Sequence, residues 1–100
     1  MAKPKVCITI GQMYYERMIN AGAMAELSSF AEVIHHEGQK PARKADLLDL
    51  LADVDACITS WDVAYLDDDV IAAAPRLKAL AHMGGSVKRY VSRSLWERGI

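Results

Sequence analysis

The chain has 100 residues, so it forms at most one small domain. Its composition, 52% hydrophobic and 25% charged, is that of an ordinary globular protein and excludes disordered, collagen-like and coiled-coil chains. Twelve basic and thirteen acidic residues give a formal net charge of -1. That balance disfavours a dedicated nucleic-acid binder, because little long-range attraction to phosphate remains.

The sequence carries no sign of a membrane span or an export signal. It has no run of about 18 uncharged apolar residues, and its start lacks the apolar stretch and small-residue cleavage site of a signal peptide. Cys7 and Cys57 each lie in a β-branched apolar run, which predicts buried free thiols rather than a disulfide. We therefore expect a cytoplasmic protein without a membrane partner.

Short apolar runs bounded by glycine or proline alternate with helical patterns along the chain. In chain order, the predicted elements are a strand at Val6–Ile10, a helix over 14–30 interrupted at 20–22, a strand at Glu32–His35, a helix over 45–52, a strand at Val54–Ser60, a helix over 68–74, a strand at Leu77–Met83 and a short helix after Ser92. The connections are short and the strands lack polar alternation. Both features indicate an α/β fold with a parallel sheet and helices on both faces.

Helix boundaries are marked by capping residues in the second half of the chain. Asp67 and Ser92 are predicted to cap the helices that follow them, because their side chains can accept hydrogen bonds from first-turn N–H groups. Pro75 and Gly99 are predicted to end the same two helices.

The chain stops at Gly99-Ile100, where the alternation would place another strand. A missing last strand would leave a sheet edge unpaired and apolar surface uncovered. We therefore expect an incomplete sheet, a piece of a longer protein, and self-association into a homodimer or larger assembly through the exposed edge. A natural short domain ending in a helix is the alternative.

The candidate ligand site follows the last predicted strand, since open parallel sheets bind ligands beyond the carboxyl ends of their strands. Gly84 and Gly85 allow a tight turn and a close approach to a ligand. The successive N–H groups of Gly84, Gly85, Ser86 and Val87 can form a nest for a carboxylate or phosphate. A plain strand-to-helix turn is the alternative.

The other polar clusters favour structural roles. The adjacent His35 and His36 point to opposite faces of an extended segment and rarely share a metal, and 67–69 fits a capped helical turn better than a Mg²⁺ site. His82 fits a core histidine better than a catalytic base, while Trp61 either lines a pocket or packs on a neighbouring loop. Because no Gly-x-Gly-x-x-Gly or P-loop occurs, we predict no nucleotide site, and without Gly-x-Ser-x-Gly acyl-transfer chemistry has no support. We also predict no metal-binding residue, since both acidic and histidine clusters have simpler structural explanations.

The second half of the chain carries a more specific pattern over residues 54–100. A helix ending Ala-Pro-Arg-Leu-Lys is followed by a strand, a glycine-rich loop and the closing Glu-Arg-Gly-Ile. This segment resembles the N-terminal part of the D-isomer-specific 2-hydroxyacid dehydrogenases, and residues 1–53 fit the same layout loosely. The resemblance implies a flavodoxin-like substrate domain that is completed by segments from both chain ends, with a nucleotide-binding Rossmann domain inserted between them.

The same resemblance implies roles for particular residues. The amides of Gly84, Gly85, Ser86 and Val87 would hold the carboxylate of a small 2-hydroxy or 2-oxo acid, and Ser60 and Trp61 would line the substrate pocket. Many members of the family have an Asp or Asn a few residues after the glycine loop, whereas residues 86–90 here are more basic and bulkier, which indicates an unusual or larger substrate.

The resemblance also implies what residues 1–100 lack. The family's catalytic residues and its NAD or NADP site belong to other parts of the enzyme, so we expect no cofactor in this chain and no dehydrogenase activity from it alone. Two alternatives remain: a stand-alone flavodoxin-like module that binds an anion or a protein without catalysis, and a purely structural product that folds by self-association.

Overall fold

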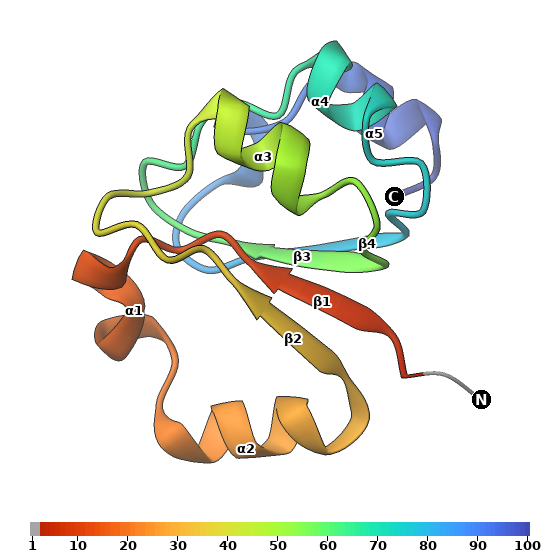
Figure 1. Ribbon diagram of the computed structural model, residues 1–100. Coiled ribbons are helices and arrows are strands. Elements are labelled where there is room, and N and C mark those ends of the chain that lie inside the picture. Colours follow the sequence, from red (N-terminus) through yellow and green to blue (C-terminus); the bar gives the residue numbers. More distant parts are fainter. Residues whose placement is uncertain (1–2) are drawn as a thin grey trace.

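The structure, a computed structural model, describes residues 3–100 and places four short strands in one sheet (Figure 1). The strands are β1 (Lys5–Ile8), β2 (Glu32–His35), β3 (Ala56–Thr59) and β4 (Ala79–His82). All neighbouring strands pair in parallel, in the order β2-β1-β3-β4. This order is compatible with a flavodoxin-like sheet, and the predicted α/β class with a parallel sheet is confirmed.

Helices cover both faces of the sheet, as the sequence predicts. The helices are α1 (Gln12–Met18), α2 (Ala21–Phe30), α3 (Lys44–Leu50), α4 (Asp68–Ala72) and α5 (Arg93–Glu97), and a 3₁₀ turn, η1 (Val87–Arg89), follows β4. In Figure 1, α1 and α2 lie below the sheet, and α3, α4 and α5 lie above it. We call these sides the lower and the upper face.

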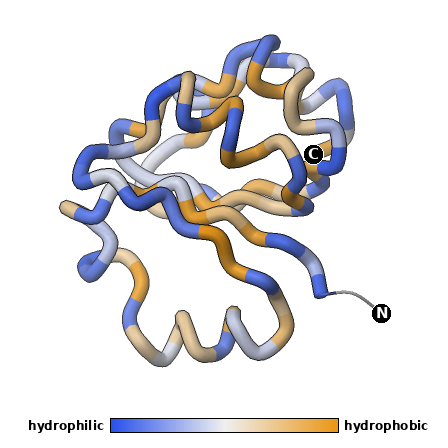
Figure 2. Tube along the Cα trace, viewed as in Figure 1, coloured by the Kyte–Doolittle hydropathy of each residue, from blue (hydrophilic) through white to orange (hydrophobic). Residues whose placement is uncertain are grey.

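The upper face carries the larger core. Its buried members, the upper cluster, are Cys7, Ala42, Leu47, Leu51, Val54, Cys57, Val63, Leu66, Val70, Ile71, Ala74, Leu77, Val91 and Leu95. On the lower face, the lower cluster buries Ile8, Ile10 and Ile19, with half-buried side chains of α1 and α2 around them. Figure 2 shows the hydrophobic segments running along the strands and across the helices that pack on them.

Two predicted helix caps have different outcomes. The Asp67 carboxylate accepts a hydrogen bond from the Val70 N–H at 2.9 Å, so this cap is confirmed. Ser92 occupies the predicted position, but its hydroxyl pairs with that of Ser94 at 2.7 Å and makes no cap bond. The side-chain cap predicted there is wrong, because the nearby Ser94 hydroxyl engages the group that would have accepted the backbone bond.

The two cysteines are buried and free, as predicted. Cys7 and Cys57 are partners in the pairing of β1 with β3, and both belong to the upper cluster. Burial raises the pKa of each thiol to about 12. Both thiols therefore stay protonated near neutral pH and are poor nucleophiles.

The predicted interruption at 20–22 is a helix junction. Asn20 ends the turn after α1 and caps α2, because its side-chain oxygen accepts a hydrogen bond from the Ala23 N–H at 2.7 Å. None of the helices formed by residues 3–100 has the length and apolar character needed to span a bilayer.

Candidate functional site

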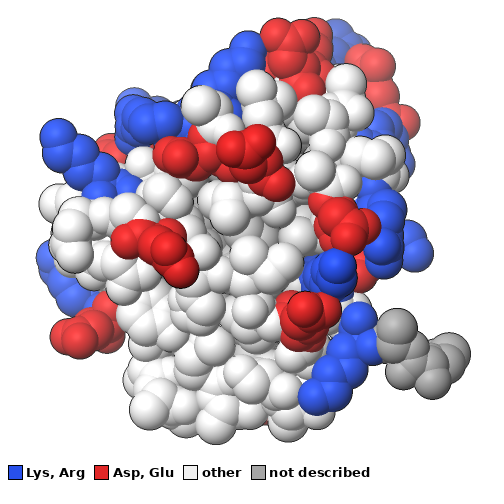
Figure 3. Space-filling view, viewed as in Figure 1, with Lys and Arg blue, Asp and Glu red and all other residues white. Residues whose placement is uncertain are grey.

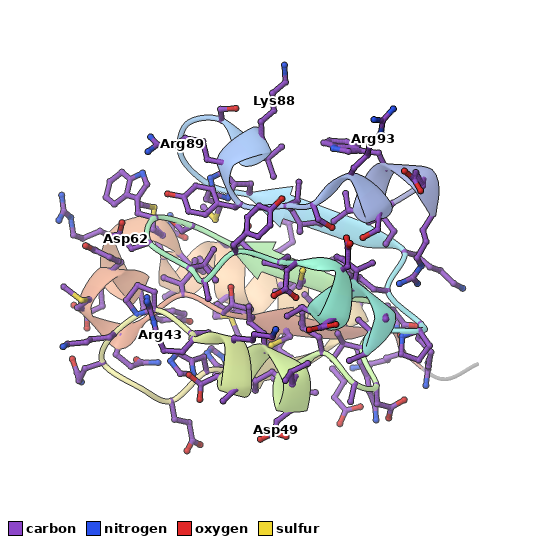
Figure 4. The ribbon with its side chains drawn as sticks, turned by 90° about the horizontal axis from the view of Figure 1, so that it is seen from above. Arg43, Asp49, Asp62, Lys88, Arg89 and Arg93 are labelled. Atoms are coloured by element: carbon purple, nitrogen blue, oxygen red, sulfur yellow. The ribbon has the colours of Figure 1, made fainter. Side chains whose placement is uncertain are left out.

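The carboxyl ends of β3 and β4 bring the predicted site residues together. Trp61 and Asp62 lie in the loop after β3, and Gly84 and Gly85 lie in the loop after β4. Figure 4 looks down on the upper face and shows Asp62 at the same end of the molecule as Arg43, which precedes α3. The site is therefore built from loops that the upper helices anchor.

Gly84 packs directly under the indole of Trp61. A Cβ atom on Gly84 would lie 2.3 Å from Trp61 Nε1, far inside van der Waals contact. Gly84 has φ +113° and Gly85 has φ +53°, which are conformations that favour glycine. Backbone geometry and the space beneath Trp61 thus both select glycine at position 84, and the sequence-predicted Gly84 and Trp61 are in contact.

The amides of the glycine loop are free. Within residues 3–100, no protein atom accepts a hydrogen bond from the N–H of Gly84, Gly85 or Ser86. The Ser86 hydroxyl accepts a weak bond from Lys88 N–H at 3.3 Å and so starts η1. Consecutive unpaired amides in a turn with positive φ values are the donors that a small anion requires.

Ser60 holds the loop in place. It is 1% exposed, and its hydroxyl donates to the Met83 carbonyl at 2.7 Å. The Met83 N–H in turn donates to the Thr59 carbonyl at 2.8 Å. These two bonds fix the backbone just before Gly84. Because the Ser60 hydroxyl already donates its proton to the Met83 carbonyl, it does not donate to a ligand in this structure.

Trp61 forms a partly exposed aromatic wall beside the loop. Its side chain is 39% exposed and packs edge-on against Tyr14, with the ring centres 5.6 Å apart. The guanidinium carbon of Arg17 lies 5.8 Å from the centre of the indole, within cation–π range. Trp61 therefore both packs on the neighbouring loop and borders the solvent side of the site.

Asp62 is a site residue that the sequence did not reveal. It has φ +62°, an unusual conformation for a residue other than glycine, although aspartate tolerates it better than most. Arg43 Nη2 donates to its carbonyl at 2.7 Å, and the Tyr14 hydroxyl donates to its carboxylate at 3.2 Å. The Tyr14 bond raises the pKa of that tyrosine. These contacts hold the loop after β3 in its strained form.

His82 is only partly satisfied, in contrast to the core histidine expected from the sequence. Its Nδ1 is hydrogen-bonded to the Thr59 hydroxyl at 2.8 Å, and its ring stacks on Tyr90 with centres 4.8 Å apart. Its Nε2 is buried and has no partner among the residues that the structure describes. Because a buried unpaired ring nitrogen is costly, a ligand group is a natural partner for it.

A cavity of about 320 Å³ connects His82 with the glycine loop. Apolar side chains form most of its walls, so it suits the apolar part of a small ligand. Its lining residues are Leu80, His82, Gly85, Val87, Leu95, Trp96 and Ile100.

The turn after β1 does not fit a dinucleotide. The N–H groups of Gln12 and Met13, which begin α1, donate to the carbonyls of Gly38 and Gln39 at 2.9 and 3.0 Å. A phosphate would have to displace both bonds, so this turn offers no cradle for one. Across residues 3–100, no group of three or more metal-ligating side chains is assembled. His36 Nε2 instead bonds the Lys40 carbonyl at 2.9 Å.

Comparison with known proteins adds no relative. No protein-family profile matches the chain, and no curated protein matches it either. The function has to be inferred from the residues of the site and their geometry.

Proposed function

We propose that residues 1–100 form part of the substrate-binding lobe of an enzyme that resembles the D-isomer-specific 2-hydroxyacid dehydrogenases. In this proposal the chain binds the carboxylate of a small 2-hydroxy or 2-oxo acid. A second lobe supplies NAD or NADP and the groups that move protons, so residues 1–100 alone have no dehydrogenase activity.

The observation that carries the proposal is the set of free amides at Gly84, Gly85 and Ser86. They follow the carboxyl end of β4, which is where open parallel sheets bind ligands. Lys88 and Arg89 follow within a few residues and add positive potential. An anion is the ligand that this combination favours.

Each neighbour has a role in this proposal. Gly84 and Gly85 let the backbone approach the carboxylate, and Trp61 shields one side of it from water. Ser60 acts as a positioning residue, because its hydroxyl holds the Met83 carbonyl and with it the start of the loop. His82 Nε2 offers one further hydrogen bond to an oxygen of the ligand, and Val87 supports the apolar wall.

Amide NMR can test this proposal directly. We expect D-lactate or D-glycerate to shift the amide resonances of Gly84, Gly85 and Ser86 in a saturable way. Propane-1,2-diol, which lacks the carboxylate, should leave them unchanged. Hydrogen bonds to charged groups contribute about 1.5–3 kcal/mol each, so Gly84→Ala, which displaces Trp61, should weaken binding by about 10- to 100-fold.

Gly22→Ala is the matched control, because Gly22 lies in α2 and its added Cβ would meet only the Asn20 side chain, at 3.4 Å. It should leave the titration unchanged. Saturable shifts with inorganic phosphate in preference to the hydroxy acids would favour an anion-binding module over a substrate lobe. Unchanged loop amides in every titration would contradict the proposal.

A further inference from the structure

We propose that copies of this chain associate head to tail, with the free edge of β4 in one copy pairing in parallel with the free edge of β2 in the next. The occupant of each edge is thus a second copy of the same chain. This inference concerns the two sides of the sheet and does not depend on the proposed function.

Both edges present unpaired backbone groups. The Met83 N–H donates to the Thr59 carbonyl of β3, so the alternation of a parallel strand directs the N–H and C=O groups of Leu80 and His82 away from the sheet. At the other edge, the N–H groups of Glu32 and His36 donate toward β1, so those of Val33 and His35 point outward. Parallel pairing of β4 in one copy with β2 in the next would give the outward N–H and C=O groups of both strands hydrogen-bond partners.

The β4 edge has none of the usual protection against strand pairing. Its four residues, Ala79–His82, include no charged side chain and no proline, two features by which proteins block exposed edges. Ala79 and Ala81 are exposed on the lower face, so nothing in the described chain covers them. This edge is therefore open from the side and from below.

The two sides of the molecule carry opposite charge. Residues 78–100, which form the β4 side, contain five basic side chains and one acidic one, whereas residues 32–50, which span β2 and α3, contain four acidic and three basic ones. Figure 4 shows Lys88, Arg89 and Arg93 extending from the β4 side and Asp49 on the opposite side. Figure 3, in the view of Figure 1, shows acidic groups across the middle of this face and basic groups mostly around its margins.

This charge distribution selects the head-to-tail arrangement. Pairing of two β4 edges about a two-fold axis would bring two basic sides together, and pairing of two β2 edges would bring two acidic sides together. The opposite edges attract each other and are already parallel to one another. Because a translation does not close on itself, the resulting assembly is an open chain of subunits.

The side chains at the junction are also compatible. Ile34 of β2 lies on the upper face, since its pairing partner is Cys7 of the upper cluster. In the assembly it would stand beside Leu80, whose pairing partner Cys57 places it on the same face. On the lower face, α2 packs on β2 and would reach under the bare Ala79 and Ala81 of the neighbouring copy.

Two edge-blocked variants test this interface. In Leu80→Pro and His35→Pro, the lost N–H points away from the sheet, so the internal strand pairing is kept. By light scattering, the mass of the wild type should grow with concentration beyond that of a dimer, and high salt should reduce it. Each variant alone should remain monomeric. Mixed together, the two should form an equimolar heterodimer and grow no further, because one intact edge of each kind remains.

A second pair of variants covers the case in which a proline disturbs folding. Lys78→Glu and Glu32→Lys, at the amino ends of β4 and β2, should each lower the mass of the assembly, and mixing them should restore it because opposite charges again face each other. A wild type that stays monomeric at millimolar concentration overturns the proposal. So does a Leu80→Pro variant that is monomeric while His35→Pro forms closed dimers, since that result would show β4 pairing with β4.

Discussion

Within the described residues, the upper cluster buries fourteen side chains and the lower cluster only three. The helices differ in the same way. α3, α4 and α5 each bury at least one residue, whereas α1 and α2 bury none. Most of the hydrophobic stabilisation therefore comes from the upper face, and α1 and α2 are held by half-buried contacts.

The candidate site takes its rigidity from the better-packed side. Val87 and Tyr90, on either end of η1, pack against the upper cluster. Leu66 and Val91 form an isolated parallel bridge that ties the segment before α4 to the segment after η1. The glycine loop is thus fixed at its far end by the upper core.

Replacing one buried isoleucine by alanine in each cluster should test the difference between the two faces most strongly. Ile71→Ala, in the upper cluster, should cost about 4 kcal/mol of unfolding free energy, because the tightly packed surroundings cannot close the cavity. Ile19→Ala, in the lower cluster, should cost about 2 kcal/mol, since a thinly covered site relaxes more easily. Urea unfolding of both variants measures the two values. Equal losses would show that the lower face contributes as much as the upper one.

Arg98 links α5 to the end of α4 and allows the stabilising effect of this contact between the upper helices to be measured. Its guanidinium donates to the carbonyls of Ile71, Ala74, Pro75 and Leu77, at 2.8 to 3.2 Å, and so closes the end of α4. Arg98→Ala should cost about 1–2 kcal/mol, because these carbonyls lose a charged donor but water can reach some of them. Arg93→Ala is the control. Its side chain is 91% exposed and, within residues 3–100, forms an ion pair with Glu97 alone, so the free energy of urea unfolding should change by less than about 0.5 kcal/mol.

An ion-pair network joins the connections of the upper face and makes them sensitive to acid. The Lys5 N–H donates to Asp55, and Arg76 contacts the same carboxylate, which lowers the pKa of Asp55. A carboxyl group with a lowered folded-state pKa stabilises the protein above its unfolded pKa, near 3.9, and this contribution is lost as the pH falls through the folded value. Asp55→Asn should therefore lose less stability than the wild type between neutral pH and about pH 3.

The urea midpoint measured as a function of pH provides the readout for this third prediction. Asp49→Asn serves as the control, because Asp49 is exposed on α3 and takes part in no ion pair within residues 3–100. Its acid profile should follow that of the wild type. An Asp55→Asn profile that also followed the wild type would show that this network does not contribute to the acid sensitivity of folding.

The elements of the fold were predictable from local pattern. Apolar runs of β-branched residues and the cap at Asp67 depend on near neighbours in sequence, and they appear where expected. The Ser92 cap failed because the hydroxyl of Ser94 competes for the same group, and no propensity reports such competition. The unequal covering of the two faces depends on which helix crosses which face, and that is a property of the assembled chain.

The candidate site was predictable only in part. Two consecutive glycines after a buried strand marked the loop, and Trp61 was singled out by its position after the previous strand. The contact between Trp61 and Gly84 joins residues distant in sequence. The strained Asp62 and the partly satisfied His82 have partners from segments distant in sequence, so only the folded structure reveals them.

The smallest predicted effect tests whether packing or backbone propensity stabilises the helices of the lower face. Gly22 lies within α2, where an added Cβ meets only the Asn20 side chain at 3.4 Å, so Gly22→Ala should stabilise the protein by about 0.5–1 kcal/mol. Gly99→Ala, at φ +77° after α5, should destabilise it. Because α2 buries no residue, its amides should exchange hydrogen faster than those of α3, and Gly22→Ala should slow that exchange locally. Exchange in α2 as slow as in α3 would mean that packing, rather than backbone propensity, governs the lower helices.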